Sequence, residues 1–165
     1  MKQEDEFLTV LERHKGILYK VAHSYCKDAE DRKDLVQQII YHIWKSFDRY
    51  NPEFQYSTWI YRIALNVAIS FYRKERTAAF NKVPYDENLE LLAETTDSQS
   101  TDINLRLLQQ FIHELKEIDK AIMLLYLEQK PHKEIAQIIG ISESNVGTKV
   151  NRIKILLAQK FKNLH

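Results

Sequence analysis

The sequence has few of the residues that break helices or cross-link chains. Its 165 residues include three glycines, three prolines and one cysteine, Cys26. A single cysteine excludes an internal disulfide bond and favours a reducing compartment. Scarce glycine and proline disfavour a fold built on tight turns, whereas Leu, Ile, Lys, Glu and Gln, which form helices well, are abundant. These absences favour an all-α protein.

Long apolar runs are also missing. No run approaches the roughly 18 apolar residues that a membrane span requires, and residues 1–6 carry no apolar segment and no small-residue cleavage site. We therefore expect a soluble, cytoplasmic protein without membrane insertion. The formal net charge of +1 indicates nothing by itself about nucleic acid, so the distribution of charge along the chain has to be considered instead.

Three stretches of the first half repeat apolar residues at three- and four-residue spacing, which predicts helices at about residues 6–25, 28–47 and 57–76. The second stretch begins with acidic residues, which suit the capped start of a helix. Predicted core positions of the first two helices are Phe7, Val10, Leu11, Leu18, Val21, Ala22, Tyr25, Leu35, Ile39, Ile40, Ile43, Trp44 and Phe47. No segment alternates convincingly at period two, so strands are not expected.

Residues 78–103 lack any such pattern. Between Ala78 and Asp102 the chain carries six acidic residues and one lysine, and it has little to bury. Such a composition cannot offset the entropy of ordering, so we expect a flexible acidic linker. The chain then consists of two small helical domains, residues 1–77 and 104–165, joined by residues 78–103. In the second domain helical periodicity returns, and Asp119 is expected to cap a helix.

Residues 131–157 fit a DNA-binding helix-turn-helix. Pro131 suits the first turn of a helix, and Gly140 can adopt the left-handed conformation that ends it. Ser142 is a natural N-cap for the next helix. A helical hairpin with a solvated polar face is the alternative interpretation of this segment.

The second helix of this motif separates an apolar stripe from a polar face. Val146, Val150, Ile153 and Leu157 form the stripe. Five cations and no acidic residue follow from Lys149 to Lys162. Short polar groups near the start of a helix, with cations alongside, suit entry into the major groove. The candidate DNA contacts are Ser144, Asn145, Thr148, Lys149, Asn151 and Arg152.

The third helix is apolar on two sides. Trp59, Ile60, Ile63, Val67 and Phe71 cover one side, and Tyr61, Leu65, Ala68 and Tyr72 cover the other. Such a helix is usually buried between neighbours. Its aromatic approach (Tyr50, Phe54, Tyr56) and its cations (Arg62, Arg73, Lys74, Arg76) also suit unstacked single-stranded bases.

Two segments resemble a known family. Residues 28–38 and 57–66 resemble the second domain of extracytoplasmic-function (ECF) sigma factors of RNA polymerase, and residues 133–146 resemble their fourth domain, a helix-turn-helix. The resemblance covers nearly the whole chain in the right order. It implies an alternative sigma factor that binds core RNA polymerase, directs it to promoters and promotes melting. An anti-sigma factor is a further candidate partner.

The resemblance also implies site residues. The polymerase would be bound through Asp34, Gln37, Gln38 and Tyr41, and the recognition helix would contact the duplex −35 element. A flipped base of the melted −10 element would be captured beside Tyr56 and Asn66. The candidate −10 residues are Tyr56, Thr58, Trp59, Arg62, Asn66 and Arg73. Gln38, where the family often has glutamate, and Gly147, where it often has a basic residue, depart from the pattern.

Two other classes of protein compete with this interpretation. A stand-alone helix-turn-helix regulator explains residues 104–165 but leaves the aromatic third helix without a role. An enzyme is less favoured, because the chain has no glycine-rich phosphate loop and no Ser-His-Asp arrangement. His23 and Cys26 could hold a metal, but a core cysteine beside a surface histidine is the simpler interpretation. We therefore expect no catalytic residues, no metal and no cofactor.

Overall fold

A computed structural model describes residues 2–80 and 100–164, with side-chain burial described for residues 2–74 and 102–164. The described parts contain seven α-helices, one 3₁₀ turn and no strand. The elements are α1 (Lys2–Tyr25), α2 (Ala29–Ser46), η1 (Phe47–Arg49), α3 (Tyr56–Phe80), α4 (Ser100–His113), α5 (Glu117–Leu127), α6 (His132–Ile139) and α7 (Glu143–Lys162). The predicted all-α class is confirmed. The expected linker falls mostly on residues 81–99, which lie outside the described residues.

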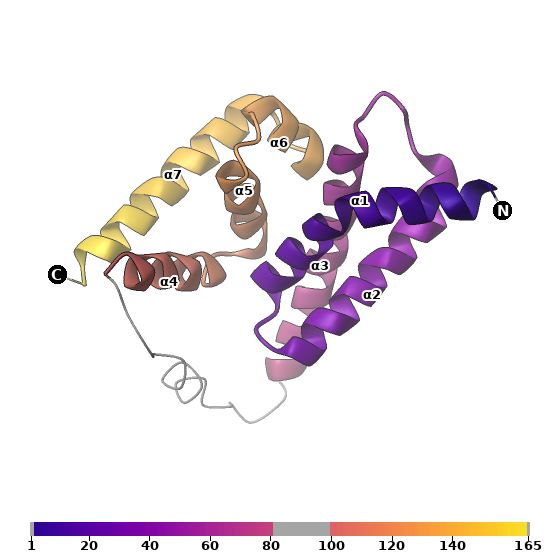
Figure 1. Ribbon diagram of the computed structural model, residues 1–165. Coiled ribbons are helices and arrows are strands. Elements are labelled where there is room, and N and C mark those ends of the chain that lie inside the picture. The colour runs from indigo at the N-terminus through magenta and orange to yellow at the C-terminus, as the bar shows by residue number, and fades with distance from the viewer. Residues whose placement is uncertain (1, 81–99, 165) are drawn as a thin grey trace.

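Helices α1, α2 and α3 pack on one another and form the first half of the molecule (Figure 1). The expected capping of α2 is observed, since the Asp28 side chain accepts a hydrogen bond from the Glu30 amide. Most predicted core positions of α1 and α2 are buried. Trp44 is an exception at 42% exposure. It is adjacent to Ile43, whose side chain points inward about 100° away on the helix, so Trp44 is left on the flank, where it meets Phe7 edge-on.

The second half consists of α4 to α7, with α6 and α7 forming the helix-turn-helix (Figure 1). Gly140 ends α6 with φ 86°, and its amide donates to the Ala136 carbonyl at 2.8 Å. Ser142 caps α7 by accepting from the Asn145 amide at 3.1 Å. Both assignments made from the sequence are confirmed.

Two details of this half differ from the expectation, and a third feature was not predicted. Pro131 is the N-cap of α6 rather than part of its first turn. Asp119 does not cap α5, because that helix begins at Glu117 with Lys116 as its N-cap. An acidic residue inside the first turn still interacts favourably with the helix dipole. Gln129 adopts φ 62°, a left-handed conformation, in the turn between α5 and α6. Glycine is the usual residue in this conformation, and the turn contains none, so the sequence did not indicate it.

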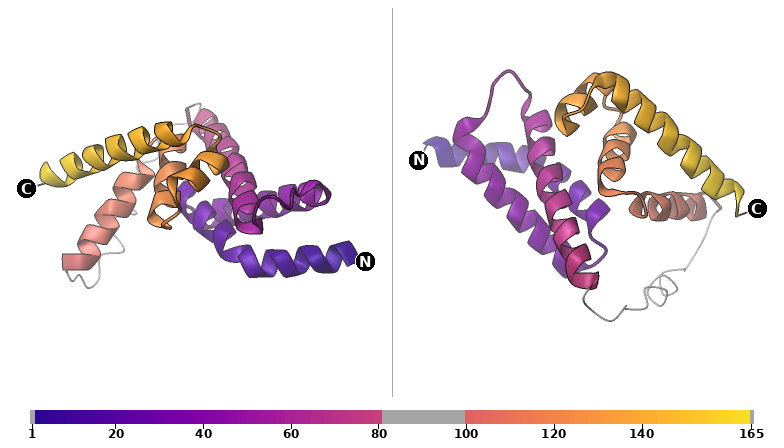
Figure 2. Two further views of the ribbon diagram at one scale, coloured as in Figure 1. Left: turned by 90° about the horizontal axis from the view of Figure 1, so that it is seen from above. Right: turned by 180° about the vertical axis from the view of Figure 1, so that it is seen from behind.

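Helix α3 is the element of the first half against which the second half packs. Seen from behind, it stands between α2 and the pair α5 and α6 (Figure 2), and it contacts all of these elements. Its second apolar side is covered by this arrangement, since Tyr61, Leu65 and Ala68 are 2% exposed or less. Burial between neighbours, one of the two interpretations of this helix, is therefore correct for these positions. The buried residues of both halves form one hydrophobic cluster.

Candidate nucleic-acid interface

The start of α7 presents a polar, solvent-exposed face. Val146, Val150, Ile153 and Leu157 are buried and fix the rotation of the helix. The side chains of the opposite face then point outward: Ser144, Asn145, Thr148, Asn151 and Arg152 are exposed, and Lys149 is half-buried. The structure thus brings all six predicted −35 residues onto about two turns of one helix.

Backbone contacts hold this face in place. Ser142 engages the Asn145 amide, and the Thr148 hydroxyl donates to the Ser144 carbonyl at 3.2 Å. Lys154 extends over the Tyr126 ring of α5, with Nζ 4.5 Å from the centroid. A capped helix start that carries hydroxyl and amide groups, with arginine and lysine beside them, can offer base-edge contacts and phosphate contacts together.

The approach to α3 is a cluster of aromatic rings. Tyr56 stacks on Tyr50 with ring centroids 4.1 Å apart and an interplanar angle of 13°. Trp59 meets the Tyr50 ring edge-on at 5.2 Å, and the Tyr50 hydroxyl donates to the Phe54 carbonyl. Burial raises the pKa of Tyr56, with Glu6 and Tyr50 acting in the same direction, so this tyrosine, neutral near pH 7 like any other, keeps its proton to a higher pH than an ordinary one. Neutral aromatic faces held by stacking suit contacts with unpaired bases.

The other predicted −10 residues divide into two groups. Arg62, Asn66 and Arg73 are exposed and follow one another along one side of α3. Thr58 is only 6% exposed, and its hydroxyl donates to Glu134 Oε1 of α6 at 2.9 Å. In this arrangement α6 therefore covers Thr58.

The predicted polymerase-binding residues share one exposed face of α2. Asp34, Gln37, Gln38 and Tyr41 are all exposed, with Tyr41 at 58%. Lys45 Nζ lies 6.0 Å from the centroid of the Tyr41 ring, and Trp44, also exposed, directly precedes Lys45 in the sequence. Polar residues around two exposed aromatic rings are a composition typical of protein interfaces.

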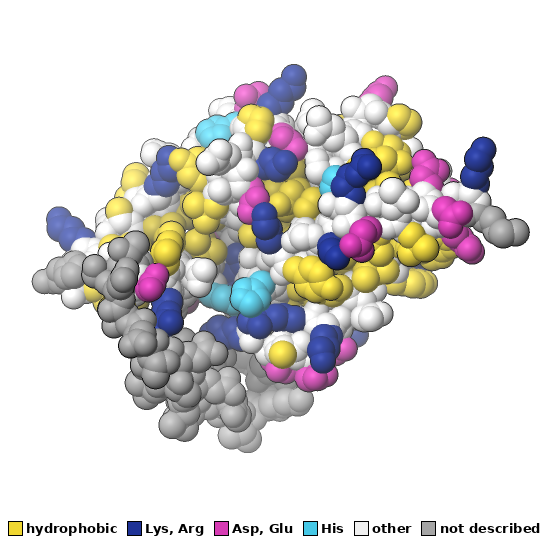
Figure 3. Space-filling model, viewed as in Figure 1, with side chains coloured by type: hydrophobic (Ala, Val, Ile, Leu, Met, Phe, Trp, Pro, Cys, Tyr) yellow, Lys and Arg dark blue, Asp and Glu magenta, His cyan; other side chains and the backbone are white. Residues whose placement is uncertain are grey.

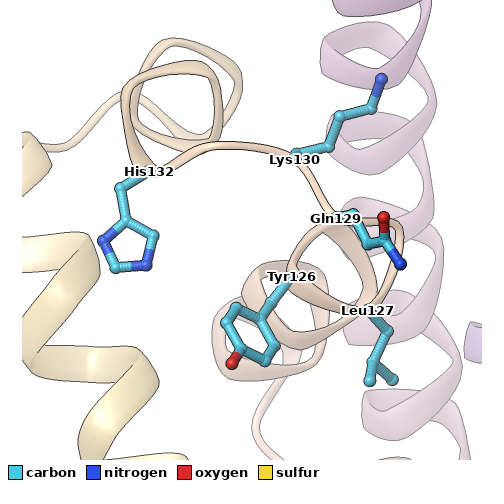
Figure 4. A pocket seen from close by; sticks show the side chains of 5 residues that line it. All are labelled: Tyr126, Leu127, Gln129, Lys130 and His132. Carbon is cyan, nitrogen blue, oxygen red and sulfur yellow. The ribbon is translucent and has the colours of Figure 1, made fainter.

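The residues that join the two halves were not predicted from the sequence. Glu117, Lys120 and Lys130 belong to α5 and the turn that follows it, and each contacts the first half. Lys and Arg side chains and histidines gather near this junction (Figure 3). A close view shows Lys130 directed toward α3 and His132 toward α7, beside a shallow hollow that Tyr126, Leu127 and Gln129 also line (Figure 4). Neither periodicity nor a motif marks such residues.

His23 and Cys26 are arranged as the simpler of the two interpretations of this pair predicts. Cys26 is 5% exposed and His23 is exposed, as the simpler interpretation predicted. No group of three or more His, Cys, Asp or Glu residues with the geometry of a metal site occurs in the described parts of the chain. Within residues 2–80 and 100–164, no helix is both long and apolar enough to span a membrane.

The two halves match two family models. Residues 10–78 match Sigma-70 region 2, and residues 105–157 match Sigma-70, region 4. The RNA polymerase sigma factor SigV of Bacillus subtilis (strain 168) is 31% identical over 155 residues, which cover 92% of this chain and 89% of SigV. The ECF RNA polymerase sigma factor SigW of the same organism is 23% identical, over 98% and 91% of the two chains.

Two solved structures share the fold. CnrH in complex with the cytosolic domain of CnrY has a TM-score of 0.69 and 18% identity, covering 97% of this chain and 90% of the other. The sigma factor RpoE in complex with the anti-sigma factor NepR from Bartonella quintana has a TM-score of 0.63 and 18% identity, covering 96% of each chain. The protein belongs to the ECF family of RNA polymerase sigma factors. As an alternative sigma factor, it directs RNA polymerase to promoters.

Proposed function

We propose that three surfaces of this chain divide the work of initiation. The polar face of α7 contacts the duplex −35 element, and the aromatic approach and exposed side of α3 capture unpaired bases of the −10 element. The face of α2 around Tyr41 docks on core polymerase. One observation supports this division. The same chain exposes the polar, capped start of α7 and, at the start of α3, a cluster of aromatic rings with basic side chains beside it.

The proposed action consists of binding alone. We infer that the chain works in the cytoplasm, beside the polymerase, without a catalytic residue, metal or cofactor of its own. The complexes of CnrH with CnrY and of RpoE with NepR support an anti-sigma protein as a further partner here. A stand-alone regulator would need only α6 and α7, so it accounts less well for the exposed residues of α2 and α3.

The test compares variants of the two DNA surfaces. Arg152→Ala should weaken binding to −35 duplexes about equally for all sequences and reduce the salt slope by about one. Asn145→Ala should instead lose discrimination at one or two base pairs, each worth about 1–3 kcal/mol. Both side chains are exposed, so neither change should affect folding. Binding titrations on native and altered −35 duplexes measure both effects.

Variants of α3 should affect a later step. Asn66→Ala and Tyr56→Ala should leave closed complexes nearly intact and reduce the permanganate reactivity of −10 thymines, because their partner is exposed only after melting. Ser70→Ala, exposed one turn after Asn66, and Tyr56→Phe, which keeps the stacked ring, are the matched controls. Normal opening by both test variants would refute the assignment of α3.

A further inference from the structure

The two halves of the chain meet along the length of α3. Near its start, Thr58 donates to Glu134 of α6, and Lys130 lies over the Tyr61 ring at 5.7 Å. Toward its end, Arg73 Nε lies 2.8 Å from Glu117 Oε1 of α5. The interface therefore extends over about four turns of the helix.

Helix α1 adds two more contacts to this interface. The Tyr25 hydroxyl donates to the Glu117 carbonyl at 2.6 Å. Lys20 Nζ lies 2.9 Å from Glu128 Oε2, an ion pair whose side chains are 51% and 32% exposed. Polar contacts of this kind are typical of domain interfaces that open and close, and exposed ion pairs stabilise them only weakly.

The centre of the interface holds a buried charge. Lys120 of α5 is 0% exposed, and its Nζ has no hydrogen-bond partner among the described residues. The ammonium lies 5.0 Å from the ring centroid of Tyr25 and 4.8 Å from that of Tyr72. Both rings belong to the first half, so the lysine is enclosed only while the two halves are together.

The groups around Lys120 compensate the charge of its ammonium group only in part. Burial and, after it, Lys27 lower its pKa, Cys26 and Glu117 oppose them, and the resulting pKa is about 8. The half-buried His113 is also close enough for Lys120 to lower its pKa. Attraction to two aromatic rings recovers part of the desolvation cost of an ammonium group, but a buried charge without a hydrogen-bonded anion remains unfavourable.

The closed arrangement also engages part of the proposed −10 surface. Thr58 lies beneath Glu134, and Arg73 is paired with Glu117. Thr58 can contact promoter DNA only after α6 has moved away, and Arg73, whose side chain is 61% exposed, must exchange Glu117 for a phosphate. Domain closure and binding to the −10 element therefore compete for the same helix.

We propose that the free chain occupies a closed form that engages part of the −10 surface, and that Lys120, enclosed by Tyr25 and Tyr72, keeps this form weak enough for core polymerase to open it. The inference rests on the proposed function of α3. It assigns to Lys120 a role in setting the balance between the closed and open forms. An uncharged side chain of similar length at this position should make closure stronger.

Single-molecule Förster transfer on the full chain measures this balance directly. Dyes at Lys33→Cys on α2 and Gln137→Cys on α6, both exposed positions, in a Cys26→Ala background report closed and open populations. Lys120→Met should lower the open fraction about tenfold or more, because it removes the desolvation cost. Tyr72→Leu should raise the open fraction, because the closed form then loses the attraction between the Lys120 ammonium and one of its two aromatic rings. Lys20→Met, which removes an exposed lysine of the same interface, should change it less than about threefold.

Binding to core polymerase provides the second measurement. Core polymerase can open the chain only by binding the open form better than the closed form, so the apparent affinity of Lys120→Met should fall, by at most the same factor as its open fraction. An unchanged or larger open fraction in Lys120→Met, with a circular dichroism spectrum like that of the parent chain, would overturn the proposal. So would a Tyr72→Leu variant that remains as closed as the parent. Failure of the α3 assignment would appear separately, as normal melting by the Asn66 and Tyr56 variants.

Discussion

His113 is a half-buried residue whose titration makes the stability of the fold depend on pH. Burial, reinforced by Lys120 and Lys27, lowers its pKa to about 4, below the ordinary 6.5. At pH 7 it is neutral in both the folded and the unfolded chain. Below pH 6.5 the unfolded chain takes up a proton that the folded chain resists, so the free energy of unfolding falls as the pH falls toward 4.

We expect this loss to reach about 1–2 kcal/mol, allowing for solvent screening at a half-buried site. Urea denaturation at pH 7, 6 and 5 measures it. His113→Gln should reduce the dependence in this window, while His14, whose pKa burial also lowers, contributes equally to both proteins. An identical slope in the parent and the variant would rule out His113 as the titrating group.

Helix α7 contains a glycine where its family often has a basic residue. A Cβ at Gly147 would lie 3.7 Å from His132 Nδ1 and 3.8 Å from Cε1, which are ordinary contact distances. The position therefore borders α6 and has room for a methyl group. Gly147→Ala should raise the free energy of unfolding by about 0.5–1 kcal/mol, because glycine loses more entropy in a helix.

Chemical denaturation measures this gain. Gly16→Ala in α1, where a Cβ meets nothing within 4 Å, should give a similar increase and serves as the control. If Gly147→Ala destabilised the chain while Gly16→Ala stabilised it, the contact with His132 would be tighter than the structure shows.

Local periodicity made most of the elements predictable. The inward stripe of α7, the left-handed Gly140 and the Ser142 cap depend on neighbours within a few residues, so the sequence contains the information that places them. Trp44 was assigned wrongly because an apolar residue beside the stripe fits a helical pattern whether or not another helix covers it. The conformation of Gln129 left no signal either, since the usual glycine is absent.

The candidate site was predictable only in part, for the same reason. The exposure of the α7 and α2 residues follows from which side of each helix is apolar. The burial of Thr58 and Lys120 depends on how α5 and α6 pack against α3, which no window of sequence encodes. The acidic Glu117 and Glu134 look like ordinary surface residues until both halves are seen together.

The balance between the closed and open forms of the whole molecule should depend on the salt concentration. Among the described residues, the ion pairs of Lys20 with Glu128 and of Arg73 with Glu117 join its halves, and three of these four side chains are more than 30% exposed. Salt screens exposed pairs, so raising it from roughly 0.05 to 1 M should increase the open fraction about two- to threefold. Transfer between the α2 and α6 dyes measures the change. Lys20→Met should flatten the response, and an open fraction that falls with salt would indicate that apolar contacts dominate closure.

The contacts along α3 join parts of one chain, and this connectivity sets how strong they need to be. A partner on the same chain is present at an effective concentration that can reach roughly the millimolar range. Contacts too weak to hold two separate proteins together at cellular concentrations can therefore keep this one mostly closed. Closure is also independent of how much protein the cell makes, so dilution or overexpression would not shift it. At a given salt concentration, a competitor for the same surfaces that is present in sufficient amount changes the fraction of molecules that is open.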